Sequence, residues 1–266
     1  MKNKILPLIL ISFVIASCSG SMDNENISLK EEAQSYRYVE YLLCDYGPDA
    51  SEESIGNMVR EWNGVIDSLE TTVSNSVGLF PREERDFFDM IWVLIWDSKE
   101  KRERGWKEWI EGPAEEWAKK TNSILSCGAA TNGTVRNYAF DVSSYRTVSQ
   151  DPEPGGVTGF TYCTYTEDYG KAELLTSLNE FNGWLDGFDT PEGGSTYFYT
   201  IQEPLFERPI EGSDLTYDYA FHHFWDSEES RNIGSNLFAQ TVPVDPDIVT
   251  PDCSEMFLYD SYPFRY

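Results

Sequence analysis

The stretch WDSKEKRERG at residues 96–105 is repeated without a gap as WDSEESRNIG at residues 225–234. Both copies follow the pattern W-D-S-x-E-x-R-x-x-G. Three further pairs of similar segments occur in the same order: DYG at 45–47 with DYG at 168–170, EWNGVID at 61–67 with EFNGWLD at 180–186, and FDVSSYR at 140–146 with YDSYPFR at 259–265. Collinear matches of this kind indicate a tandem duplication. Its period of roughly 120 residues is the size of a small domain.

The elements that we expect in each copy are strand, helix, strand, strand, helix, strand. The helix expected at 52–69 carries apolar residues at the three- and four-residue spacing of one buried face. The other expected elements of the first copy are strands at 36–44, 76–80, 87–96 and 134–142 and a helix at 98–125 that is interrupted at Gly112-Pro113. This order is that of the ferredoxin-like unit, which has four mostly antiparallel strands and both helices on one face.

The strand expected at 87–96 is apolar on both faces, and this predicts how the two copies pack. One set consists of Phe88, Met90, Trp92, Leu94 and Trp96, and the other of Ile91, Val93 and Ile95. A strand that is apolar on both sides is buried on both sides. Helices can cover one face, so we expect the sheet of the sister copy to cover the other.

This arrangement resembles the dimeric α+β barrel superfamily, here with both halves fused in one chain. The predicted fold class is therefore α+β, with two tandem ferredoxin-like (βαββαβ) modules packed sheet to sheet as a fused dimeric α+β barrel. The superfamily includes cofactor-independent and haem-handling enzymes. The resemblance rests on element order and duplication, so it carries no catalytic residue over to this chain.

The N-terminal residues 1–18 resemble a bacterial lipoprotein signal. Lys2 and Lys4 precede an apolar run over 5–16 that is too short to span a bilayer stably. The run ends in Ile15-Ala16-Ser17-Cys18, and a small residue before a cysteine is typical of signal peptidase II cleavage and acylation of that cysteine. The resemblance implies a protein anchored to the lipid bilayer through acyl chains on Cys18. An ordinary signal peptide with an incidental cysteine is the alternative.

The expected location is the cell envelope, at the outer membrane, because Ser19 rather than Asp follows the lipidated cysteine. The chain then divides into five segments. These are a lipoprotein signal peptide at 1–17, a flexible tether at 18–35, module 1 at 36–147, a linker at 148–158 and module 2 at 159–266.

The charge of the chain argues against nucleic acid as a partner. Its 46 acidic and 20 basic residues give a net charge of −26, which repels polyanions. A solvated surface is the simplest interpretation of this acidity, and cation binding is the alternative. Asp245, Asp247 and Asp252 lie close together but lack the glycine and terminal glutamate of an EF-hand loop. We therefore predict no metal site and no cofactor.

Four cysteines follow Cys18, and an even number in an exported protein indicates two disulfides. In a ferredoxin-like module the last strand pairs with the first, so the entry of the last strand lies near the exit of the first. This topology predicts the pairs Cys44 with Cys127 and Cys163 with Cys253. A metal site is the alternative, although no CxxC or Cys-His spacing occurs.

The only histidines, His222 and His223, are adjacent on an expected strand and so point to opposite faces. His223 shares its face with Tyr217, Tyr219, Phe221 and Trp225. If this aromatic face looks into the space between the sheets, His223, Tyr219 and Trp225 are the candidate pocket or catalytic residues. A core histidine bonded to backbone or tyrosine is the simpler interpretation.

The repeated W-D-S-x-E pattern itself has a structural interpretation. Asp97 with Glu100, and Asp226 with Glu229, have the spacing of a helix N-cap and its reciprocal partner. The sequence shows no phosphate-binding glycine loop, no G-x-S-x-G elbow and no HExxH.

These observations favour a lipoprotein that binds a small apolar or aromatic ligand in an inter-sheet cavity. One alternative is a cofactor-independent or haem-handling enzyme with His223 as base or iron ligand. The other is a structural or interaction module of the cell envelope.

Overall fold

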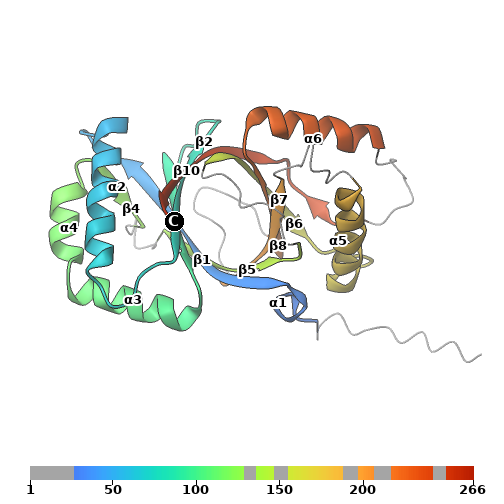
Figure 1. The fold of residues 1–266 in the computed structure, drawn as a ribbon, viewed down its shortest axis with the longest axis horizontal. Helices are drawn as coiled ribbons and strands as arrows, with labels where there is room; N and C mark the ends of the chain where they lie inside the picture. Colours follow the sequence, from blue (N-terminus) through green and yellow to red (C-terminus); the bar gives the residue numbers. More distant parts are fainter. Residues whose placement is uncertain (1–26, 129–135, 147–154, 188–196, 207–216, 242–249) are drawn as a thin grey trace, which may run out of the picture.

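The computed structural model describes residues 27–128, 136–146, 155–187, 197–206, 217–241 and 250–266 (Figure 1). The predicted signal peptide and Cys18 lie outside these ranges. In the described part of the chain, no helix combines the length and the apolar character needed to cross a membrane.

Each half of the chain contains the predicted order of elements. Module 1 consists of β1 (Ser35–Tyr46), α2 (Glu52–Asp67), β2 (Asn75–Pro81), β3 (Met90–Trp96), α3 (Lys99–Glu111), α4 (Ala114–Thr121), β4 (Leu125–Cys127) and β5 (Asn137–Ser144). Module 2 consists of β6 (Gly156–Thr164), α5 (Lys171–Asp186), β7 (Phe198–Pro204), β8 (Tyr219–Trp225), α6 (Glu228–Thr241), β9 (Asp252–Cys253) and β10 (Phe257–Arg265). The short α1 (Leu29–Glu32) precedes both.

The strands close into a barrel, as expected for a fused dimeric α+β barrel. Module 1 has the strand order β5-β1-β3-β2, and module 2 has the order β10-β6-β8-β7. The edges join because β5 pairs with β7 and β10 pairs with β2, all antiparallel. The short strands β4 and β9 pair only with β1 and β6. The sister sheets therefore face each other across the barrel interior, which explains why β3 is apolar on both faces.

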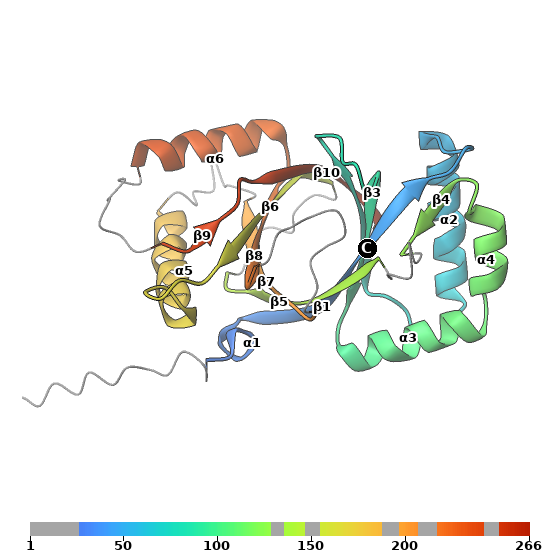
Figure 2. The same cartoon turned by 180° about the vertical axis from the view of Figure 1, so that it is seen from behind.

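The helices lie outside the barrel, in two groups on opposite sides (Figures 1 and 2). Helices α2, α3 and α4 cover module 1, and α5 and α6 cover module 2. The core accordingly has three parts. One cluster fills the barrel interior around Tyr41 and Phe160, and one lies under each helical group, around Trp92 and around Tyr199.

The repeated motif is explained by contacts between each strand and the helix that follows it. A Cβ on Gly105 would lie 2.6 Å from the ring of Trp96, so only glycine allows α3 this close to β3. The same pair in module 2 is looser, because a Cβ on Gly234 would lie 3.8 Å from Trp225. The motif arginines also differ, since Arg102 reaches Glu40 in β1 whereas Arg231 pairs with Glu228 in its own helix.

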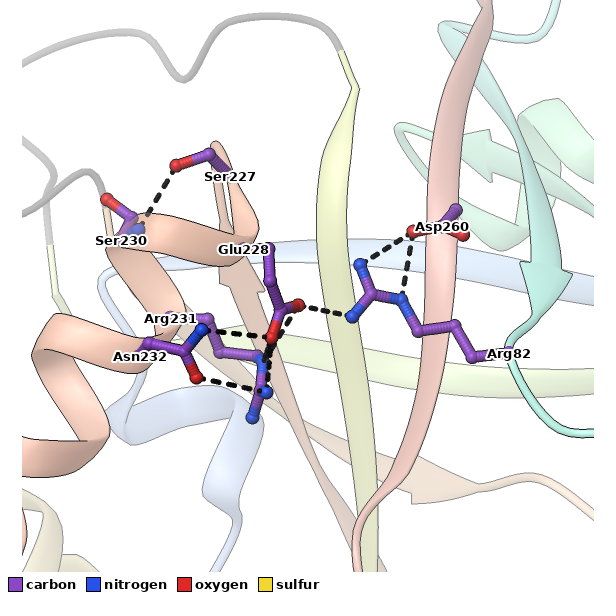
Figure 3. Close-up of polar contacts among 7 residues, drawn as sticks. All are labelled: Arg82, Ser227, Glu228, Ser230, Arg231, Asn232 and Asp260. Carbon is purple, nitrogen blue, oxygen red and sulfur yellow. Dashed lines mark hydrogen bonds and ion pairs between the residues drawn. The ribbon is translucent and has the colours of Figure 1, made fainter.

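The predicted N-caps are wrong by one residue. Ser98, not Asp97, caps α3 by accepting a hydrogen bond from the backbone N–H of Lys101, and Ser227 likewise accepts from Ser230 (Figure 3). Asp97 instead accepts a hydrogen bond from Ser74 at 2.8 Å. The hydroxyl after the aspartate is the group within reach of the N3 amide.

An ion-pair network links the two modules at the β2–β10 edge (Figure 3). Arg82, which follows β2, donates to Asp260 of β10 from Nε at 2.9 Å and from Nη2 at 2.7 Å, and also to Glu228 of α6. Contacts with Arg231 and Arg82 lower the pKa of Glu228 to about 2. Glu228 therefore stays ionised, and can pair with both arginines, at any pH well above 2.

The expected segment boundaries shift in two places. Residues 29–32 form a helix within the expected tether, and the buried Leu29 packs in the core of module 2, where its carbonyl accepts a hydrogen bond from the Tyr145 hydroxyl at 2.6 Å. Strand β6 begins at Gly156, inside the expected linker. Burial of Leu29 holds the helix at residues 29–32 in place, and pairing with β10 extends β6 back to Gly156.

Both predicted disulfides are confirmed. Cys44 bonds Cys127 across β1 and β4, and Cys163 bonds Cys253 across β6 and β9. Each bond lies within one module, where the exit of the first strand meets the entry to the last.

Candidate functional site

The barrel interior contains a cavity of about 290 Å³, which we call the inter-sheet cavity. Ten of its thirteen lining residues are aromatic: Tyr41, Phe87, Phe88, Tyr138, Phe140, Phe160, Tyr162, Tyr217, Phe257 and Tyr259. Leu43, Ile91 and Arg85 complete the wall. Both modules contribute, because β1, β3 and β5 face β6 and β10 across the interior. The volume is near the lower end of the range of small-molecule pockets, about 300–1,000 Å³.

Arg85 is the one charged residue in this wall. It lies between β2 and β3, and its guanidinium carbon is 4.6 Å from the centroid of the Phe257 ring. Its Nε and Nη2 atoms are buried and have no hydrogen-bond partner among the described residues. The exposed Glu83 carboxylate forms an ion pair with Nη2 at 3.9 Å, a distance that is too long for a hydrogen bond. The cavity therefore presents a guanidinium whose donors are available.

The cavity also contains tyrosine hydroxyls that stay protonated. Burial raises the pKa of Tyr162 and Tyr217 well above the ordinary value, and it raises the pKa of Tyr259 to about 12. Arg85 opposes the shift at Tyr162 and Tyr259 but does not outweigh burial. The Tyr217 hydroxyl is buried without a partner in the described structure. A ligand can therefore receive hydrogen bonds from a neutral phenol as well as from Arg85.

A chain of polar side chains lies behind the aromatic wall. Gln202 Nε2 is 2.7 Å from both the Tyr41 hydroxyl and His222 Nδ1. His222 Nε2 contacts the Thr158 hydroxyl, which donates to the carbonyl of His223 at 2.6 Å. Because the hydroxyl hydrogen of Thr158 is used there, His222 Nε2 must carry the hydrogen and Nδ1 must accept from Gln202. This neutral tautomer agrees with burial, which lowers the pKa of His222 well below its ordinary value.

His222, not His223, faces the barrel interior, so the condition that made His223, Tyr219 and Trp225 candidate pocket residues is not met. Directly opposed residues of paired strands share a face, and His222 opposes Phe160, which lines the cavity. Its ring stacks on Phe160 with the centroids 3.7 Å apart.

The predicted pocket residues His223, Tyr219 and Trp225 all lie on the outer face of β8. Tyr219 and Trp225 belong to the core under α5 and α6. The reason is the pairing of β8 with β6. His222 and Ala220 lie opposite Phe160 and Tyr162, which face the cavity, so the alternate residues of β8 face outward. Tyr217 does line the cavity. It lies before the first residue of β8, so the alternation of inward and outward side chains along that strand does not apply to it.

His223 nevertheless has an oriented ring. Its Nδ1 lies 2.9 Å from the Tyr197 hydroxyl, and the ring stacks between Phe221 and Trp225 at centroid distances of 4.5 and 5.6 Å. No hydrogen bond to its Nε2 is made by any described residue. Burial lowers the pKa of His223 to about 3, so the imidazole is neutral.

Sequence reasoning missed Arg85. It lies in the charged segment Arg82-Glu83-Glu84-Arg85-Asp86, and nothing in the sequence distinguishes it from Arg82. Arg82 turns to surface carboxylates, whereas Arg85 turns to the barrel. The Phe87-Phe88 pair that follows was the available signal, since both rings line the same cavity. Within the described ranges, no three His, Cys, Asp or Glu side chains are grouped to hold a metal ion.

Comparison with known proteins finds likeness in structure only. No protein-family model matches the chain, and no curated protein matches its sequence. A structure described as an anthrone oxidase-like protein is 16% identical with a TM-score of 0.45, over 90% of this chain and 96% of that one. A chlorite dismutase variant from Candidatus Nitrospira defluvii with cyanide is 12% identical with a TM-score of 0.49, over 90% and 96%. A protein from Fusobacterium nucleatum subsp. nucleatum, described provisionally as a monooxygenase, is 10% identical with a TM-score of 0.45, over 87% and 94%.

Proposed function

We propose that this protein binds a small aromatic molecule with an acidic group in the inter-sheet cavity. The observation that carries the proposal is Arg85, whose buried Nε and Nη2 donors have no hydrogen-bond partner in a wall that is otherwise mostly aromatic. A buried donor without a partner costs free energy. A carboxylate that accepts both N–H groups removes that cost and forms a charge-assisted, bidentate contact.

The rest of the wall suits the aromatic part of such a ligand. Tyr41 already packs edge-on against Phe140 and Phe160, with centroid distances of 5.2 and 5.7 Å. Rings in this arrangement favour a further aromatic ring by burial and by edge-to-face contact. The net charge of −26 opposes an anion at long range. The apolar part of the ligand must therefore supply much of the affinity.

The test compares two probes that differ only in charge, 2-naphthoate and its amide 2-naphthamide. Isothermal titration calorimetry of the protein without its predicted signal peptide, residues 1–17, should show tighter binding of 2-naphthoate than of 2-naphthamide. Arg85→Met should weaken 2-naphthoate by about tenfold or more, the equivalent of about 1.4 kcal/mol, and leave 2-naphthamide unchanged. Arg60→Met, which removes an exposed arginine of α2, is the matched control. Equal affinity of the variant and the parent protein for 2-naphthoate would exclude Arg85 as the recognition group.

A second candidate function is a cofactor-independent or haem-handling enzyme, the alternative that the sequence also allows. The observation in its favour is His223, because Tyr197 holds Nδ1 while no described residue bonds Nε2. A histidine oriented through one nitrogen is the arrangement of a general base or a metal ligand. A haem group does not fit the described residues around His223, since the rings of Phe221 and Trp225 stack against the imidazole and His223 does not line the inter-sheet cavity.

Titration with haemin tests whether haem is excluded, and we expect no saturable binding, which leaves the cofactor-independent enzyme as the second candidate. A Soret shift that is lost in His223→Ala would show that haem does bind at His223. His222→Ala is the control, because both nitrogens of His222 are already bonded inside the barrel. Binding that survives in His223→Ala rejects His223 as the ligand.

We also propose that Cys18 carries acyl chains that hold the protein at the outer membrane. The support is the sequence alone: a charged start, a short apolar run and Ala16-Ser17 before the cysteine. Metabolic labelling with palmitate, followed by membrane fractionation, should show incorporation that Cys18→Ser abolishes. A labelled Cys18→Ser protein would contradict the proposal.

A further inference from the structure

We infer that module 1 contains a second binding site, for an uncharged, flat, apolar molecule. The site is a cavity of about 380 Å³ between the outer face of the module 1 sheet and helices α2, α3 and α4. Six of the eight tryptophans of the chain line it: Trp62, Trp92, Trp96, Trp106, Trp109 and Trp117. We call it the tryptophan cavity. It is larger than the inter-sheet cavity and lies on the opposite face of β1 and β3, so it goes beyond the function proposed above.

The cavity exists because the helices touch the sheet only at certain points. Gly105 is the one buried residue of α3, and it fixes that helix against Trp96. The chain then breaks at Gly112-Pro113, and α4 starts in a new direction. Trp109 and Trp117, from the two helices, meet edge to face with centroids 6.0 Å apart. On the other side Trp62 and Trp92 meet at 5.1 Å.

The tryptophans present their rings to the cavity while several of their N–H groups are bonded elsewhere. Trp96 Nε1 and Trp106 Nε1 donate to Glu40 Oε2 at 3.0 and 2.7 Å. Trp92 Nε1 donates to the Ser76 hydroxyl at 2.9 Å. These indoles therefore offer apolar faces to a ligand and keep their polar atoms satisfied. That is the surface on which a planar hydrocarbon or aromatic ring stacks.

The wall of the tryptophan cavity carries no charged side chain, and this favours an uncharged ligand. Glu40 is fully buried behind the tryptophans, and Arg102 neutralises it with two hydrogen bonds to Oε1 at 2.9 and 2.6 Å. The residues that line the cavity include no Lys, Arg, His, Asp or Glu. A charged ligand would lose its hydration here without gaining an opposite charge. An uncharged ring loses little hydration and gains the full burial of its apolar surface, about 25 cal/mol per Å².

The test uses the neutral fluorophore N-phenyl-1-naphthylamine. Because the lining tryptophans surround the site, bound fluorophore should quench their emission and gain emission by energy transfer. We expect N-phenyl-1-naphthylamine to bind saturably to the protein without its predicted signal peptide. The anionic analogue 1-anilinonaphthalene-8-sulfonate should bind at least about tenfold more weakly at this site, measured with the inter-sheet cavity saturated by 2-naphthoate. Equal affinity for the two fluorophores would overturn the assignment of an uncharged ligand.

Filling the cavity gives the structural control. Ala118 of α4 lines the cavity, so Ala118→Phe should weaken the neutral fluorophore by about tenfold or more. Ala239→Phe, at an exposed position of α6, is the matched substitution and should change nothing. Ala118→Leu makes the same test with a smaller side chain if Ala118→Phe fails to fold, as judged by circular dichroism. Unchanged binding in the folded Ala118 variant, or loss of binding in Arg85→Met, would place the fluorophore elsewhere and reject the site.

Discussion

The guanidinium carbon of Arg85 lies 4.6 Å from the centre of the Phe257 ring, so a side chain of module 1 rests on a ring of module 2 inside the barrel. Arg85 is the one charged residue in the wall of the inter-sheet cavity. Its Nε and Nη2 donors have no hydrogen-bond partner among the described residues. A buried charged group whose donors are not hydrogen-bonded adds little to the stability of the folded protein.

Replacing Arg85 should not harm the ligand-free protein. Arg85→Met keeps the apolar contact with Phe257 and removes buried donors that have no partner, so we expect a free energy of unfolding that is unchanged or up to about 1 kcal/mol higher. Urea unfolding measures it. A loss of more than about 1 kcal/mol would assign Arg85 to structure and not to ligand recognition.

The two motif glycines should respond differently to alanine. In Gly105→Ala the new Cβ would lie 2.6 Å from the Trp96 ring, and overpacking of this kind costs about 1–3 kcal/mol. In Gly234→Ala the nearest atom of Trp225 is 3.8 Å away, an ordinary contact, and the helix gains up to about 1 kcal/mol from the higher propensity of alanine. Thermal unfolding of the two variants compares them directly. Equal destabilisation would show that the two copies of the motif pack alike.

Glu40 should be the most costly single polar residue to replace in module 1. It is fully buried and accepts hydrogen bonds from Arg102, Trp96, Trp106 and Asn137. Glu40→Gln leaves the Arg102 charge without its partner, and we expect a loss of about 3–5 kcal/mol in the free energy of unfolding.

A double-mutant cycle with Arg102→Met separates the ion pair from the rest of this network. The double variant should lose less than the sum of the two single variants. Glu103→Gln, at an exposed position of α3, is the control and should stay within about 0.5 kcal/mol of the parent protein. Strict additivity would contradict the direct contact between Glu40 and Arg102.

The two histidines should make stability fall in mild acid. Burial lowers the pKa of His223 from 6.5 to about 3 and lowers the pKa of His222 well below 6.5, so both are neutral in the folded protein. The unfolded chain binds protons at both as the pH drops below 6.5, which favours unfolding. Stability is therefore complete above pH 6.5 and is lost as pH falls from 6.5 toward 3, by up to about 1.4 kcal/mol per pH unit for each histidine.

Urea unfolding between pH 7 and 5.5 isolates this effect from the carboxylates, which titrate lower. His223→Gln should remove about half of the slope. A parent protein whose stability does not change across this interval would show that the histidines take up protons in the folded protein as readily as in the unfolded chain.

Much of the architecture follows from local patterns in the sequence. The apolar spacing at 52–69 predicts α2, found at Glu52–Asp67, and the Gly112-Pro113 break predicts the division between α3 and α4. The duplication and element order together give the disulfide pairs, because the ends of the first and last strands must meet in each module. These features depend on residues that are close along the chain or belong to the same module, so they can be predicted from the sequence.

The sites depend on which face of a strand turns inward, and that is a property of the closed barrel. Alternation establishes that His222 and His223 point opposite ways, but only the pairing of β8 with β6 places His222 opposite Phe160 and inside. Arg82 and Arg85 are indistinguishable in the sequence, and the closure of β2 against β10 sends one to the surface and the other to Phe257. The sequence by itself therefore determined two ferredoxin-like modules and their disulfides. The tertiary structure decided the walls of both cavities, because burial of a face is settled by the strands and helices that come to cover it.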